Sequence, residues 1–276
     1  MLGGNDGVLY WQADDTWPGP SWSSIEIKGR LKVGHYAMQR AFAPRTVAGR
    51  ILNGSLVVHF SRSDYSHLPT VGTLRLTAYK WSGGVAGASS EHTVALPGPH
   101  SSGRLLNTRI EPVLAATGCG GSGMKSECVL LLEVLTGKAA TTESDGRSAP
   151  TVLAKNWVYL TPFNEVTTMS DPGLVVQLVE CVAPPPPLAD PNATASTGLG
   201  GGGTFNVTVA AARVPAALVW LETALPGRWS DNGLLLTTEV LVLQWFAYDS
   251  SATAAQLKAS LSVWSLFDVA RGYSST

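Results

Sequence analysis

The segment Gly72-Thr-Leu-Arg-Leu-Thr-Ala-Tyr-Lys-Trp81 decides the fold class, because apolar and polar side chains alternate along it. Successive side chains of a β-strand point to opposite faces, so this pattern predicts a strand with one face in a core. Four more segments in the same part of the chain are predicted as strands: Ser55–Ser61, His92–Leu96, Cys128–Leu135 and Asn156–Leu160. Turns rich in glycine and serine separate them, which is typical of an antiparallel β-sandwich. Arg109–Ala115 fits either a short helical turn or a loop.

A second run of predicted strands completes another sandwich: Leu174–Val182, Thr204–Ala210, Leu218–Glu222, Leu234–Thr238, Val240–Tyr248 and Leu261–Asp268. Residues 183–203, rich in proline and glycine, interrupt this run between its first two strands. We interpret them as an insertion in a hairpin rather than a linker between domains, because the flanking strands are both needed for one sandwich. A long insertion is tolerated because the entropy of loop closure grows only logarithmically with length. Ser230-Asp-Asn-Gly233 predicts a turn between strands.

The N-terminal residues follow a different pattern. Val8–Trp11 is an apolar run that predicts a buried strand, and a polar loop rich in proline and tryptophan follows. Arg30–Phe42 has the spacing of a helix with one apolar side, formed by Val33, Tyr36, Ala37, Ala41 and Phe42. One strand and one helix cannot bury both faces of that strand by themselves.

Composition excludes several classes of protein. The chain has 276 residues, of which 14% are charged, and its formal net charge is −1. It has no basic excess with which to neutralise phosphates, so we predict no nucleic-acid partner. No stretch approaches the ~20 apolar residues that cross a bilayer, so we predict no membrane span. The N-terminus lacks the basic and apolar regions of a signal peptide.

The three cysteines suggest a local bridge rather than a metal site. Cys119 and Cys128 flank a glycine-rich loop and are a candidate disulfide, whereas Cys181 lies in an apolar run and is expected to be buried. The spacing of histidine and cysteine does not fit a zinc site, so we predict neither a metal nor a cofactor. Three glycosylation sequons begin at Asn53, Asn192 and Asn206.

Trp11, Trp17 and Trp22 form a tryptophan cluster in the N-terminal loop. Indole rings stack on the C–H faces of sugars, but such a cluster also fits aromatic packing in a core or loop. Asp14 and Asp15 are rejected as a pair of glycosidase carboxylates, because adjacent strand residues point to opposite faces. We expect these aspartates to orient the loop, and His35 to be a structural histidine.

The whole N-terminal segment resembles one family. Its motifs are Gly7-Val-Leu-Tyr-Trp-Gln-Ala-Asp-Asp-Thr-Trp-Pro-Gly-Pro-Ser-Trp-Ser-Ser-Ile-Glu26, Gly29-Arg-Leu-Lys32, His35-Tyr36 and Phe42-Ala-Pro44. They resemble the β-mannosidases of glycoside hydrolase family two. Later motifs also resemble that family: Asn156-Trp-Val-Tyr-Leu-Thr-Pro-Phe-Asn-Glu165, Val219-Trp-Leu-Glu222, Gly227-Arg-Trp-Ser-Asp-Asn-Gly233 and Ser262-Val-Trp-Ser-Leu-Phe-Asp268.

The resemblance implies a division of the chain into three parts. Residues 1–43 would be the last strand, loop and helix of a catalytic (β/α)8 barrel. Residues 44–168 would be one immunoglobulin-like β-sandwich, and residues 169–276 a second one that carries the insertion 183–203. The fold class is therefore mainly β, with two immunoglobulin-like antiparallel sandwiches preceded by the last unit of a barrel. The family usually has asparagine where this chain has Asp14.

The resemblance also implies a function and a site. The family removes terminal β-D-mannose from oligosaccharides with retention, using two glutamates on earlier barrel strands. This chain would then hold no catalytic residue and would be inactive alone, its partner being the missing N-terminal part of the same enzyme. Trp11 would form the floor of the subsite for the terminal sugar, with Gln12, Asp15 and Trp17 beside it, and the Trp11–Gln12 peptide would be cis.

Two further hypotheses stay open. One is a carbohydrate-binding or structural pair of sandwiches without catalysis, and the other is a barrel completed by a separate chain. The family, the sequons and the candidate disulfide favour a lysosomal or secreted location.

Overall fold

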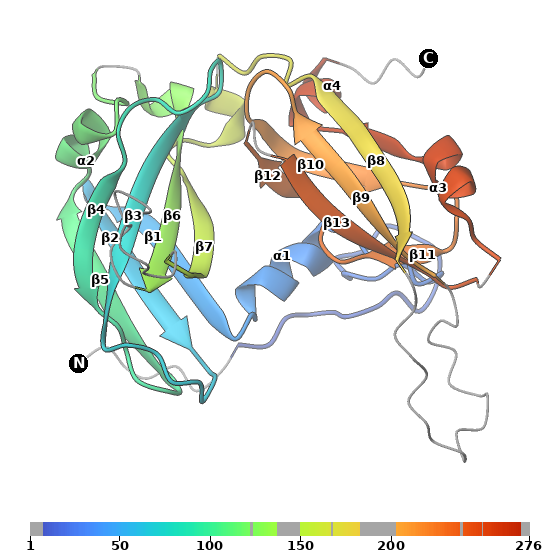
Figure 1. The fold of residues 1–276 in the computed structure, drawn as a ribbon, viewed down its shortest axis with the longest axis horizontal. Helices are drawn as coiled ribbons and strands as arrows, with labels where there is room; N and C mark the ends of the chain where they lie inside the picture. Colours follow the sequence, from blue (N-terminus) through green and yellow to red (C-terminus); the bar gives the residue numbers. More distant parts are fainter. Residues whose placement is uncertain are drawn as a thin grey trace, which may run out of the picture.

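The computed structural model describes residues 8–121, 124–136, 150–166, 168–182, 203–237, 240–249 and 251–271. Within these residues two β-sandwiches lie side by side, and helix α1 (Val33–Ala41) lies between them (Figure 1). All the pairings between named strands are antiparallel. The prediction of a mainly β, antiparallel fold is confirmed.

The first sandwich contains seven strands. One sheet has the order β1-β2-β5 and the other β4-β3-β6-β7. Their bounds are β1 (Arg45–Leu52), β2 (Ser55–Arg62), β3 (Val71–Lys80), β4 (Ser90–Ala95), β5 (Ser101–Arg109), β6 (Cys128–Thr136) and β7 (Val152–Tyr159). Helix α2 (Ile110–Ala116) and a short 3-10 helix, η1 (Met124–Glu127), lie between β5 and β6.

The alternation along β3 places Leu74, Leu76 and Ala78 in the core between the two sheets, as its sequence predicts. Opposite this sheet, β1 approaches so closely that Gly49 leaves no room for a side chain. A Cβ atom there would lie 2.6 Å from Val158 Cγ2 and 2.7 Å from Leu132 Cδ1. Asn156 Nδ2 also donates to the Val47 carbonyl at 2.9 Å, so β1 and β7 are joined at this edge of the sandwich.

Two strands of this sandwich are not predicted from the sequence. Strand β1 carries arginine and glycine among its apolar residues, and β5 begins Ser-Ser-Gly-Arg. Both form because they pair with β2 on either side, where the ladder hydrogen bonds satisfy their backbones. The ambiguous segment Arg109–Ala115 is largely helix α2.

The second sandwich has one sheet of order β11-β13-β9-β8 and another of order β12-β10-β14. The strand bounds are β8 (Leu174–Val182), β9 (Thr204–Ala211), β10 (Ala216–Glu222), β11 (Gly227–Trp229), β12 (Leu234–Leu236), β13 (Val240–Ala247) and β14 (Ser262–Trp264). Helices α3 (Ala254–Ser260) and α4 (Leu266–Ala270) follow β13 and β14 respectively.

The interpretation of residues 183–203 as an insertion in a hairpin is confirmed by the strands around it. Strands β8 and β9 pair with each other, and Val182 lies opposite Thr204. Residues 183–202 themselves, with the sequon at Asn192, lie outside the described residues.

Two predictions for this sandwich are wrong. The strand predicted over Leu261–Asp268 is only β14, because Ser265 then begins helix α4. The Ser265 amide and hydroxyl both donate to Asp268 Oδ2, at 2.7 and 2.8 Å, which is a helix cap. Cys181 is an exposed free cysteine rather than a buried one, since β8 is an edge strand.

A third apolar cluster joins the two sandwiches. It contains Tyr79, Trp81 and Leu131 from the outer face and end of the first sandwich, and Ala217 and Leu235 from the second. All five side chains are buried. The contact fixes the relative position of the sandwiches, because apolar side chains on both are removed from water only when they meet.

We predict that Gly49→Ala destabilises the chain by about 1–3 kcal/mol, because the added methyl group must displace Val158 and Leu132. The measurement is the free energy of unfolding in urea. Gly84→Ala is the matched control, since a Cβ at Gly84 meets nothing within 4 Å. Equal free energies for the two variants would contradict the close approach of β1.

Candidate functional site

The tryptophan cluster is exposed to solvent. Trp11, Trp17 and Trp22 are 77%, 73% and 76% exposed, so they do not pack in a core of the described chain. The buried strand predicted for Val8–Trp11 is wrong: these residues form no strand and Leu9 is 100% exposed. The reason is that no described strand runs beside them, and a strand needs a neighbour for its hydrogen bonds.

A polar network holds the loop that carries these indoles. The Asp15 side chain, 8% exposed, accepts hydrogen bonds from the Ser21 hydroxyl and, at 3.0 Å, from Lys32 Nζ. Lys32 Nζ also donates to Ser23 Oγ at 2.8 Å. The backbone closes the loop as well, because the Asp15 amide donates to the Ile25 carbonyl at 2.9 Å. Asp15 thus orients hydroxyls and loop backbone, as predicted.

Ser24 connects the same loop to helix α1. Its hydroxyl lies 3.2 Å from Nδ1 of His35 and 3.1 Å from the Ala13 carbonyl oxygen, to which it donates. The Tyr10 hydroxyl is 3.2 Å from the Ser24 hydroxyl. His35 is therefore a structural histidine in this chain, since its ring is bonded within the network. Lys32 and these serines lie within the sequence motifs, but no local pattern indicates their roles in the loop.

The network lowers the pKa of Asp15 to about 2, from its usual value of 3.8. The main cause is the hydrogen bond from Ser21, followed by Ser23, with a smaller contribution from Lys32. Each favours the charged carboxylate. A permanently ionised, fully bonded carboxylate suits the holding of a loop and not proton transfer near neutral pH.

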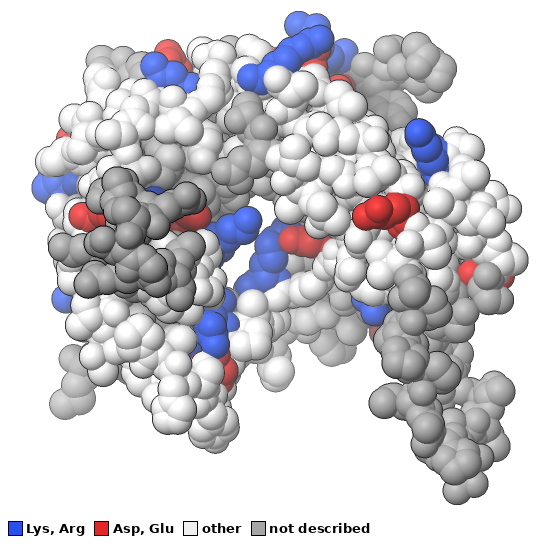
Figure 2. Space-filling view, viewed as in Figure 1, with Lys and Arg blue, Asp and Glu red and all other residues white. Residues whose placement is uncertain are grey.

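Helix α1 is attached to the second sandwich. Tyr36 is 2% exposed and belongs to the core of that sandwich, where burial raises its pKa to about 12. Arg40 pairs with Asp231 and donates to the carbonyls of Asn232 and Gly233, at 3.1 and 3.2 Å. Burial raises the pKa of Asp231, and Arg40 opposes this shift. In Figure 2 basic side chains lie along the edges of a hollow between the sandwiches.

The other candidate residues are Gln12 in the same loop, the two cysteines of the predicted disulfide and the sequon asparagines. The Trp11–Gln12 peptide is cis, which confirms that prediction, and Gln12 Nε2 donates to the Asp14 carbonyl at 2.9 Å. Cys119 and Cys128 are joined in a disulfide between α2 and β6. Asn53 is exposed in the turn between β1 and β2, whereas Asn206 is half-buried on β9.

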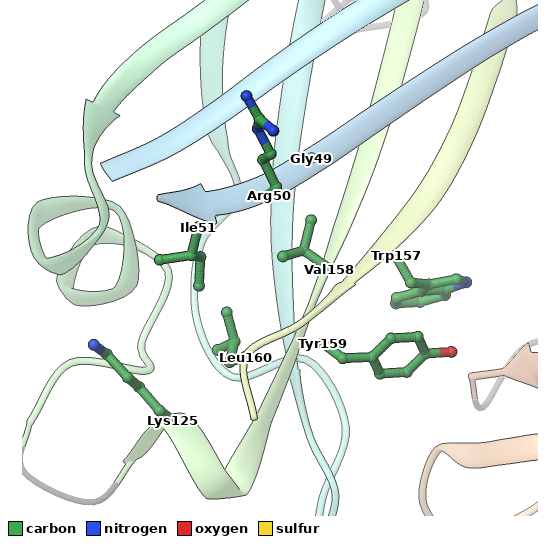
Figure 3. Close-up of a pocket in the computed structure, with 8 residues that line it drawn as sticks. All are labelled: Gly49, Arg50, Ile51, Lys125, Trp157, Val158, Tyr159 and Leu160. Atoms are coloured by element: carbon green, nitrogen blue, oxygen red, sulfur yellow. The ribbon is translucent and has the colours of Figure 1, made fainter. Parts of the chain in front are cut away.

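A cavity of about 430 Å³ lies beside β7 in the first sandwich (Figure 3). Trp157 and Tyr159 point from one face of this strand, away from Ile51, Val158 and Leu160. Both rings are already engaged, Trp157 edge-on with Tyr79 at 5.7 Å and Tyr159 with Phe163 at 4.8 Å. The rings beside this cavity are less exposed than the indoles of the N-terminal loop, since Tyr159 is 41% exposed and Trp11 77%.

Among the described residues, no group of three or more His, Cys, Asp or Glu side chains is placed to hold a metal ion. In that same part of the chain, no helix is long and apolar enough to cross a membrane.

Comparison with known proteins points to glycosidases. The family model for the Ig-fold domain of mannosidases matches residues 188–269. The β-mannosidase of Bos taurus is 28% identical over 263 residues, covering 95% of this chain and 26% of that protein. β-Mannosidase A of Aspergillus niger is 39% identical over 108 residues, which cover 38% of this chain and 11% of that protein.

Solved structures show the same fold. A β-D-mannosidase from Dictyoglomus thermophilum matches with a TM-score of 0.61 and 18% identity, over 93% of this chain and 26% of that one. An exo-chitosanase from Amycolatopsis orientalis matches with a TM-score of 0.57 and 16% identity, over 94% of this chain and 30% of that one. The chain spans about a quarter of the length of the curated relatives that it matches almost throughout.

The family match and the antiparallel sandwich assign the second sandwich to the Ig-fold domains of the mannosidase type. Over 95% of its length the chain is similar to β-mannosidases, and the matches support the resemblance to the C-terminal portion of the family-two enzymes that its motifs indicate.

We predict that the N-terminal loop opens in acid. Folding lowers the pKa of the Asp15 carboxyl group. The ionised group therefore stabilises the folded loop fully at any pH above its pKa in the unfolded chain, and the stabilisation is lost as the pH falls through its pKa in the folded chain. The emission of the exposed tryptophans should therefore change as the pH falls from 3.8 toward about 2. Asp15→Asn should show the open-loop emission already at neutral pH.

The neighbouring substitution Asp14→Asn is the control, since the Asp14 side chain is exposed and Asp15 carries the network. If Asp15→Asn kept the acid transition of the unaltered chain, Asp15 would not be the group that holds the loop.

Proposed function

We propose that this chain forms one wall of the sugar-binding site of a retaining β-mannosidase. The observation that carries the proposal is the exposure of Trp11 and Trp17 on a loop held by Asp15 and Lys32. Large exposed aromatic side chains on an ordered loop mark a binding surface, and indole faces pack well on the C–H faces of sugars. The substrate that we propose is a terminal β-mannoside of an oligosaccharide, which is supported by the named relatives.

The proposal divides the chain as its motifs suggest. Residues 1–43 supply the last strand, loop and helix of a (β/α)8 barrel, residues 44–168 the first sandwich, and residues 169–276 the second. The exposure of Leu9 and Trp11 supports the first assignment, because an apolar segment made for a barrel would lack its neighbours here. The neighbours would be barrel strands in an upstream part of the same enzyme.

The site residues have different roles in this proposal. Trp11 forms the floor under the terminal sugar, and Gln12 and Trp17 lie beside it. Asp15 takes part by holding the loop, because its carboxylate is occupied by Ser21 and Lys32. No residue of this chain is assigned a catalytic role.

The chemistry would come from two carboxyl groups on upstream barrel strands. A retaining glycosidase places an acid/base and a nucleophile about 5–5.5 Å apart across the scissile bond. The two carboxyl groups in and beside the loop of this chain already have partners. Asp15 bonds Lys32, and Glu26 lies 4.0 Å from Arg30 Nε. The chain therefore positions the sugar, and a chain without the upstream carboxyl groups would be inactive.

A lysosomal or secreted location accompanies this proposal. The disulfide between Cys119 and Cys128 supports an oxidising compartment, because such bonds are rare where thiols are kept reduced. The exposed Asn53 in its turn is a sequon that a glycosylating enzyme can reach.

We predict that the chain alone does not hydrolyse an aryl β-mannoside and that it does so when joined to the protein encoded upstream of Met1. In the joined enzyme, Trp11→Ala should lower kcat/KM at least about tenfold, or about 1.4 kcal/mol in transition-state free energy, because the floor under the sugar is lost. The measurement is release of the aryl alcohol.

Tyr65→Ala is the control, since Tyr65 is an equally exposed aromatic residue (80%) on the first sandwich. Unchanged activity of Trp11→Ala, or an upstream sequence without barrel strands, would overturn the proposal.

A further inference from the structure

A second cavity lies between the N-terminal segment and the second sandwich. Its volume is about 210 Å³, and it is bounded on one side by residues 26–31 and on the other by the turn 223–227 with the ends of β10 and β13. Neither Trp11 nor Trp17 lines it. It is smaller than the ~300 Å³ at which sites for drug-sized ligands begin, so it suits a compact ligand.

Aromatic side chains form much of its wall. Trp220 is half-buried and contacts two rings, Tyr36 edge-on with ring centroids 5.9 Å apart and Trp264 with ring centroids 6.3 Å apart. Tyr248 also lines the cavity and is 41% exposed, whereas the lining residues Trp229 and Trp245 are buried. Trp220 and Tyr248 can therefore offer ring surface to a ligand, while the buried indoles hold the wall in place.

Glycine at position 227 is required for this wall. A Cβ atom there would lie 2.5 Å from the Cε2 and Cζ2 atoms of Trp245, so the backbone passes directly over the indole ring. Any larger residue would displace the ring or the turn that borders the cavity.

The mouth of the cavity is charged but balanced. Arg30 Nη1 donates to Glu222 Oε1 at 2.6 Å, and Glu26 lies 4.0 Å from Arg30 Nε. With Lys28, the lining contains two acidic and two basic side chains. Their formal charges cancel, so the cavity favours neither an anion nor a cation. Planar carboxylate and guanidinium groups instead offer paired acceptors and donors, which match the adjacent hydroxyls of a neutral polyol.

We propose that this cavity is a second carbohydrate site, which binds one neutral hexose residue. The volume limits the ligand to about a single ring, the aromatic wall packs on its C–H face, and Glu222 with Arg30 bonds its hydroxyls. The site is formed by the second sandwich together with residues 26–31, and it does not depend on the proposed subsite at Trp11.

The test uses the chain labelled with fluorotryptophan and titrated with methyl β-D-mannopyranoside or mannobiose, followed by fluorine NMR. The resonance of Trp220, assigned with Trp220→Phe, should move on titration. Ala224→Trp places an indole at the mouth from an exposed position and should weaken binding at least tenfold. Glu222→Gln should also weaken it, because the paired acceptors are lost.

Ala48→Trp is the matched control, because Ala48 is exposed on β1, in the other sandwich, and this variant should bind as the unaltered chain does. Trp11→Ala should also bind normally, which separates this site from the proposed subsite at Trp11. The inference is overturned if Trp220 does not respond, if Ala224→Trp binds as tightly as Ala48→Trp, or if Trp11→Ala abolishes the response. The resonance of Trp81, buried at the junction of the sandwiches, reports that each variant is folded.

Discussion

The packing of Tyr36 in the core of the second sandwich is the interaction on which the position of the N-terminal loop depends. Helix α1 is only nine residues long, and such a short helix is marginal alone in water. Burial of one large aromatic side chain stabilises it by roughly 1.5–3 kcal/mol. Arg40 adds a second attachment to the turn at Asp231–Gly233. Without the second sandwich, the N-terminal segment would have little to hold it.

Hydrogen bonds from helix α1 and from the residue before it hold the N-terminal loop in place. His35 is adjacent to Tyr36 and contacts Ser24, while Lys32 just before the helix bonds Asp15. Trp11 and Trp17 can thus remain exposed and yet ordered. Ordered indoles bind a sugar without the entropic penalty of fixing a mobile loop. The second sandwich therefore helps to position the loop that carries the exposed indoles.

Local pattern predicts the strands whose apolar and polar residues alternate clearly, both in the middle of a sheet, as β3, and at an edge, as β4 and β8. Leu74, Leu76 and Ala78 alternate because β3 has a neighbour on each side and a core on one face. Strands β1 and β5 are not predicted because arginine, glycine and serine interrupt their apolar pattern. The stretch Val8–Trp11 has a strand-like pattern but forms no strand, since backbone pairing depends on residues remote in sequence. The motif of the N-terminal loop indicates which residues belong together, but the bonds among Asp15, Ser21 and Lys32 follow only from the tertiary structure.

The sequence by itself determined the antiparallel class, the hairpin around the insertion and the relationship to family-two β-mannosidases, because periodicity, turn residues and motifs are local. Only the tertiary structure decided that the indoles of the N-terminal loop face solvent, that Cys181 is exposed, and that a cavity forms between residues 26–31 and the turn 223–227. These properties depend on which surfaces meet. Burial is a property of pairs of distant segments, so no single stretch of sequence contains it.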